Sequence, residues 1–108
     1  MIFRIYLFIM EQLSQEQAQL IFKSRVWEQW TDIQLLRFQL FQNNLCMPFG
    51  KYHTTLERFL GRPIYTYTLD HQKDKLIKEV LGSDEKPTIN EIYNLIPAEI
   101  LHANTVTI

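Results

Sequence analysis

The sequence predicts an α+β domain that is mainly helical, with about four to five helices and a small sheet. Capping boxes, in which Ser or Thr precedes Gln or Glu by three residues, begin at positions 14, 31 and 88. Each stands before a run of apolar residues at helical spacing. Residues 64–69, IYTYTL, are rich in β-branched and aromatic residues and alternate like a strand. The 108 residues contain no repeat or long linker, so we expect a single domain over residues 1–108.

The first element is a run of ten residues, MIFRIYLFIM, that is apolar except for Arg4. It is too short for a membrane span, which needs about 20 apolar residues. It also lacks the small-residue cleavage site of a signal peptide. Two interpretations stay open. The run is a buried strand of the sheet, which we favour, or Met10 is the natural start and residues 1–9 are an extension.

Two helices are predicted next, over residues 15–24 and 32–43. Trp27 and Trp30 fall in the connection between them. The second helix is apolar around most of its circumference, so it is either the central helix of the core or lies against a partner as well. This wide apolar surface, together with a candidate edge strand at either terminus, makes a homodimer an open alternative.

A third helix begins at Pro48, carries an apolar stripe and ends at Gly61, where a left-handed residue is favoured. The strand at residues 64–69 follows, with Tyr65 and Tyr67 on one face. A fourth helix is expected over residues 72–81 and a fifth from residue 88 onward, followed by a short turn over residues 97–101. The tail, residues 104–108, is a candidate terminal strand of the same sheet.

Composition limits the function. The net charge is −1, from 11 basic and 12 acidic side chains, so the totals contain neither the basic excess of a nucleic-acid binder nor the acidic excess of a DNA mimic. Residues 20–62 hold six basic and three acidic side chains, a weak excess that keeps a nucleic-acid-binding regulator as the second hypothesis. The single cysteine, Cys46, excludes an internal disulfide and fits a cytoplasmic protein.

The residues that could carry chemistry are widely spaced. Cys46 and the three histidines, at positions 53, 71 and 102, lack the close pairs that usually mark a zinc site. On one helix Cys46 and His53 would lie about 10 Å apart, too far for a nucleophile and its base. We therefore expect no catalytic residue, cofactor or metal. A small enzyme or toxin centred on His53, Cys46 and Glu57 is the third hypothesis.

Binding by aromatic and arginine side chains is the more favoured interpretation, because Trp, Tyr and Arg dominate the energetics of protein interfaces. The two tryptophans could equally be core residues. Arg58 and Arg62, four apart at the end of the third helix, could bind a carboxylate or phosphate, or could stabilise the helix C-terminus. The predicted partner-binding residues are Trp27, Trp30, Arg58, Arg62, Tyr65 and Tyr67.

Residues 45–69, LCMPFGKYHTTLERFLGRPIYTYTL, resemble a short segment that recurs in small proteins of temperate phages and prophages, a family with no assigned chemistry. The preceding LLRFQLFQ is similar too, and the resemblance covers about residues 26–81. Where relatives carry an acidic residue and a His-Glu pair, this chain has Gly50 and Tyr67-Thr68. The resemblance implies an accessory protein that binds and inhibits a host defence component, as anti-CRISPR proteins do. The implied partner is a host bacterial protein such as a Cas effector.

Overall fold

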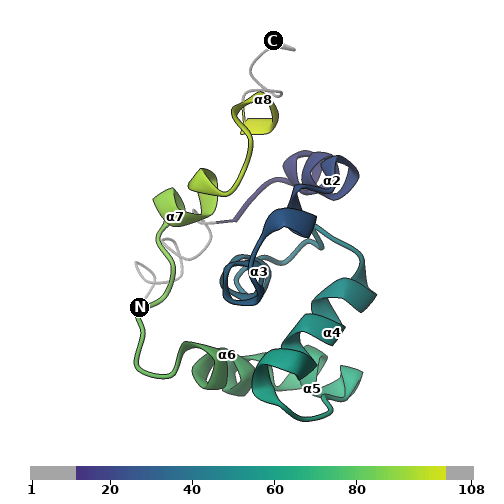
Figure 1. The fold of residues 1–108 in the computed structure, drawn as a ribbon, viewed down its shortest axis with the longest axis vertical. Helices are drawn as coiled ribbons and strands as arrows, with labels where there is room; N and C mark the ends of the chain where they lie inside the picture. Colours follow the sequence, from purple (N-terminus) through teal and green to yellow (C-terminus); the bar gives the residue numbers. More distant parts are fainter. Residues whose placement is uncertain (1–11, 102–108) are drawn as a thin grey trace.

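The computed structural model describes residues 12–101, and every regular element in that range is helical (Figure 1). A 3-10 helix, η1 (Val26–Gln29), follows the first described α-helix. The α-helices are α2 (Gln15–Ser24), α3 (Asp32–Gln39), α4 (Phe49–Leu60), α5 (Thr66–His71), α6 (Lys73–Leu81), α7 (Ile89–Asn94) and α8 (Ala98–Leu101).

The starts of α2 and α3 lie where the capping boxes predict them. The Ser14 hydroxyl accepts the backbone N–H of Gln17, and the Gln17 side chain accepts the N–H of Ser14, both at 3.0 Å. Thr31 and Gln34 make the same reciprocal pair before α3. Each box satisfies two backbone donors that a helix N-terminus leaves without a partner.

The third box, at α7, forms only by half. The Thr88 hydroxyl accepts the N–H of Glu91 at 3.1 Å. The Glu91 carboxylate does not complete the box, because it accepts two hydrogen bonds from Arg37 of α3 instead, at 2.6 and 2.9 Å. A long-range ion pair has here taken the place of the local hydrogen bond from the Thr88 N–H to the Glu91 side chain.

The predicted α+β class is wrong for the described residues, because residues 64–69 do not form a strand. Tyr65 has extended backbone and serves as the N-cap of α5, and residue 66 begins the helix. The Tyr65 carbonyl accepts the N–H groups of Thr68 and Leu69. Within residues 12–101 no strand exists to pair with this segment, and a lone strand leaves its backbone groups unsatisfied, whereas a helix satisfies them internally.

The other two predicted strands, residues 1–10 and 104–108, lie outside the described residues. The structure also has more helices than expected between residues 12 and 101. Besides α5, the segment predicted as a turn after Pro97 is the short helix α8. No helix in the described part of the chain combines the length and the apolar character that crossing a membrane requires.

The central element is α3, which packs against α4 and α6, while α2 packs against η1 and α8 (Figure 1). The side chains of Leu36, Phe38 and Leu40 are completely buried, as the apolar girth of this segment predicts. The helix is shorter than predicted, since α3 ends at Gln39 with Leu40 as its C-cap.

Buried glutamines hold the loop that follows α3. The Gln39 side chain donates to the Asn44 carbonyl at 3.0 Å and accepts the N–H of Cys46 at 2.8 Å. The Gln42 side chain accepts the N–H of Leu13 at 2.9 Å. Because buried backbone groups need partners, these amides allow the chain to leave the helix inside the core.

Candidate functional site

Both tryptophans predicted as interface residues contribute to the core. Trp27 is 4% exposed, and its indole N–H donates to the Phe22 carbonyl at 3.2 Å. The Arg25 guanidinium covers the ring, 5.2 Å from its centroid. Trp30 is half-buried and packs against Phe38, with ring centroids 4.6 Å apart. Neither ring presents a broad face to a partner.

The predicted arginines are at the surface but are already engaged. Arg58 donates two hydrogen bonds, each 2.9 Å long, to the Asp32 carboxylate of α3, and these lower the pKa of that carboxyl. Arg62 donates to Glu79 of α6 at 2.6 Å. Both pairs join α4 or its end to another helix, so they stabilise the packing of α4. The remaining arginine ion pairs in residues 12–101 are Arg25–Glu28 and Arg37–Glu91.

Tyr65 and Tyr67 are the most exposed of the large apolar or aromatic side chains within residues 12–101, at 78% and 63%. The ring of Tyr67 stacks on His71 one turn later in α5, with centroids 4.4 Å apart. Ile64 and Leu69 point inward and hold α5 against the core. The short helix therefore presents two aromatic side chains to solvent.

His53 and Glu57 form a structural clasp. They lie one turn apart on α4, with the His53 Nε2 and a Glu57 carboxylate oxygen 3.6 Å apart. Glu57 accepts the N–H of Ile64 at 2.8 Å, and His53 Nε2 lies 2.5 Å from the Ile64 carbonyl oxygen. Both backbone groups of Ile64 are thus satisfied by α4, which fixes the chain as it leaves that helix.

Cys46 is not part of the contacts that His53 and Glu57 make with Ile64. Its side chain is completely buried, with the sulfur 3.6 Å from the Asn44 carbonyl oxygen, and burial raises the pKa of the thiol to about 12. The thiol therefore stays protonated at neutral pH and is a poor nucleophile. Within residues 12–101 no three His, Cys, Asp or Glu side chains gather in a way that could hold a metal ion.

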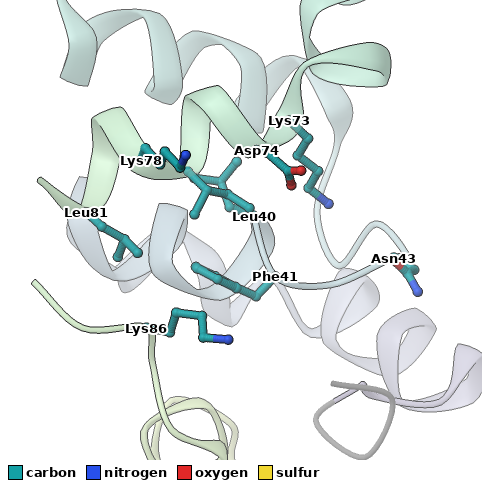
Figure 2. Close-up of a pocket in the computed structure, with 9 residues that line it drawn as sticks. Leu40, Phe41, Asn43, Lys73, Asp74, Lys78, Leu81 and Lys86 are labelled. Carbon is teal, nitrogen blue, oxygen red and sulfur yellow. The ribbon is translucent and has the colours of Figure 1, made fainter. Parts of the chain in front are cut away.

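A groove that was not predicted from the sequence lies along α6 (Figure 2). This α6 groove has a volume of about 480 Å³, within the usual range of small-molecule pockets. Phe41 lies between α6 and Lys86 of the following loop. The groove is lined by the apolar side chains of Leu40, Phe41, Ile77 and Leu81 and by Asn43, Lys73, Asp74, Lys78 and Lys86.

The signal for this groove is present in the sequence of α6. Its apolar residues Leu76, Ile77, Val80 and Leu81 make a stripe two residues wide in each turn. Leu76 and Val80 are buried against the core, while Ile77 and Leu81 are only half-buried and line the groove. A stripe wider than one neighbouring helix can cover indicates a second contact surface.

Searches against protein-family models, curated proteins and solved structures find no match to this chain.

Proposed function

We propose that this chain is a phage- or prophage-encoded accessory protein that binds and inhibits a bacterial defence component, such as a CRISPR-Cas protein. The observation that carries the proposal is the exposure of Tyr65, the N-cap of α5, and of Tyr67 in its first turn. Tyrosine supplies a large contact area at small entropic cost and is enriched in interface hot spots. The resemblance of residues 45–69 to the phage segment supports the origin, and both tyrosines lie within it.

The contacts of the other candidate residues favour binding over the alternative functions. A nucleic-acid-binding regulator contacts phosphates through arginines and lysines, and all four arginines in residues 12–101 are paired with carboxylates, which leaves only the lysines of that range for this role. An enzyme centred on His53, Glu57 and Cys46 needs these groups together. His53 and Glu57 hold Ile64, and Cys46 is buried beside Asn44.

The test is capture of partners by the tagged protein from nuclease-treated lysate of a bacterium with active defence systems. Each captured protein is then purified and its affinity for the chain is measured. We expect Tyr65→Ala together with Tyr67→Ala to weaken binding about 30-fold or more, the loss of a hot spot of about 2 kcal/mol or larger.

Tyr93→Ala is the matched control, because Tyr93 lies on α7, away from the α5 tyrosines in the chain, and is 38% exposed. It should leave both affinity and thermal stability nearly unchanged. Expression of the wild-type chain should also restore plaque formation by a phage that the host defence targets. Partner binding that the double variant retains, or an absence of protection, would contradict the proposal.

A further inference from the structure

We infer that the α6 groove is a docking site for an acidic amphipathic helix of the partner protein, with apolar side chains seated against Phe41, Ile77 and Leu81 and a carboxylate at Lys73. The inference rests on the proposed function, since it names the chemistry of the protein that is bound. Helices of this kind bind apolar grooves through residues at spacings of three, four and seven.

Shared lining residues link the α6 groove to a second hollow, and link that hollow to a third. A hollow of about 220 Å³ shares Asn43 and Lys73 with it and is also lined by Leu45 and Phe49. A third hollow, of about 330 Å³, shares Leu45 with the second and reaches Phe22. Leu45, Phe49 and Phe22 are 43%, 39% and 38% exposed, so apolar surface is available along this path.

The charges along the path select an acidic partner. Four lysines line the hollows, against the two carboxylates Asp70 and Asp74. In residues 12–101 the arginines are ion-paired, whereas none of these lysines lies within ion-pair distance of a carboxylate. Complementary potentials across an interface determine which partners are accepted. The four lysines are Lys23, Lys73, Lys78 and Lys86.

Lys73 lines both the α6 groove and the second hollow. It is the position where a partner carboxylate would contribute most to the free energy of binding. It is half-buried, and its ammonium group makes one long hydrogen bond, 3.4 Å, to the Gln42 carbonyl. Burial lowers the pKa of the ammonium group, and the neighbouring Asp74 only partly offsets this. A partly desolvated charge that lacks a close counter-ion is stabilised when an opposite charge arrives.

The second hollow contains another group that lacks a partner. Tyr52 is 5% exposed and lines this hollow, and its hydroxyl has no hydrogen-bond partner among residues 12–101. Unsatisfied buried donors are uncommon in folded proteins. Among the described residues, the hollow that Tyr52 and Lys73 both line therefore contains a donor that a polar group of a partner could satisfy.

The test is selection of binders to the full-length protein from a random peptide library, with peptides long enough for about four helical turns. We expect enriched peptides to carry apolar residues at helical spacing and an excess of Asp and Glu. Lys73→Glu should weaken the binding of a selected peptide about tenfold or more. Lys75→Glu is the matched control, since Lys75 is exposed on the same helix and does not line the groove. It should change affinity less than about threefold.

A second variant separates a loss of binding from a loss of folding. Lys73→Glu combined with Lys86→Glu should reverse the selection, so that the enriched peptides carry Lys and Arg, a result that a misfolded protein cannot give. The inference is overturned by enrichment of neutral or basic peptides on the wild type, by no enrichment, or by acidic peptides that Lys73→Glu binds equally well.

Two alternative occupants of the groove would give different experimental results. Selection that succeeds only after removal of residues 1–9 would assign the groove to the chain's own N-terminal segment. Sedimentation as a dimer that Ile77→Asp dissociates would assign it to a second copy. Both outcomes overturn the inference. A defence protein captured through Tyr65 and Tyr67 without any selected acidic peptide would leave the proposed function standing and overturn the inference alone.

Discussion

Individual polar side chains in this protein act mainly on backbone groups and on other helices. Gln39 and Gln42 hold the loop after α3, and Glu57 and His53 hold Ile64. Arg37 and Glu91 join α3 to α7. In the sequence, side chains with these structural roles cannot be told from catalytic or binding residues, because the residue types are the same. Only their partners distinguish the roles.

The Arg37–Glu91 pair makes stability depend on pH. The two hydrogen bonds from Arg37 lower the pKa of the Glu91 carboxyl from its ordinary value of 4.5. The folded state therefore favours the ionised form. The stabilisation that the ionised Glu91 gives the folded state is complete above pH 4.5 and is lost as the pH falls through the lowered pKa.

Glu91→Gln should accordingly reduce the free energy of unfolding at neutral pH by about 1 kcal/mol or less, since the carboxylate is partly exposed. Thermal denaturation at several pH values should show the difference from wild type shrinking below pH 4.5. Glu85→Gln, in the exposed loop after α6, is the control and should match wild type throughout. A constant difference at all pH values would contradict this account.

The burial of Trp27 leads to a second prediction at this scale. Trp27→Ala should lower the free energy of unfolding by about 3–5 kcal/mol, because it removes a buried ring and the indole hydrogen bond to Phe22. Urea denaturation followed by circular dichroism measures this directly. Trp27→Phe, which retains most of the apolar volume, should cost clearly less. If the alanine variant were as stable as wild type but no longer bound its partner, Trp27 would be an interface residue and this prediction would be wrong.

At the scale of elements, local signals were reliable where the stabilising contact is itself local. Gly61 was predicted to end the third helix, and it caps α4 with φ of +71°, its N–H bonded to the Glu57 carbonyl at 2.8 Å. The strand prediction for residues 64–69 failed because strand formation depends on a second strand, which the described residues do not provide. Alternation of β-branched and aromatic residues is a weak preference that tertiary context overrides.

Two glycines, Gly50 inside α4 and Gly61 at its C-cap, provide a matched test of this helix. Gly61→Ala should lower the free energy of unfolding by about 1 kcal/mol or more, because alanine is strained in left-handed backbone. Gly50→Ala should raise it by about 0.5 kcal/mol, because alanine is the better helix former. Neither added methyl would meet an atom within 4 Å, so packing does not interfere. If both variants shifted the urea midpoint in the same direction relative to wild type, the assigned helix end would be contradicted.

At the scale of the whole molecule, the two ends of the described chain are joined through one core. The helix α8 packs against α2, and Ile100 of α8 is 9% exposed within the same cluster as Ile21 of α2 and Leu36 of α3. Residues far apart in sequence therefore share their buried surface. We expect residues 12–101 to unfold as one cooperative unit.

Ile100→Ala tests this cooperativity. It should lower the free energy of unfolding by about 2 kcal/mol, the low end of the range for isoleucine, and should leave a single transition. Tryptophan fluorescence reports on Trp27 and Trp30, and circular dichroism reports on all helices, so the two urea curves should coincide. Tyr93→Ala, on the exposed side of α7, should have little effect. Separate transitions for the two probes would show that α7 and α8 form an independent unit.

The sequence by itself determined where α2 and α3 begin and where α4 ends, because a capping residue and its bonding partner lie only three or four residues apart. The tertiary structure decided the helical state of residues 64–69, the burial of Trp27, the carboxylate that each arginine binds and the groove beside α6. Each of these depends on groups brought together from distant parts of the chain. The wide apolar stripe of α6 indicates a second contact surface, but local sequence does not contain which distant groups form it.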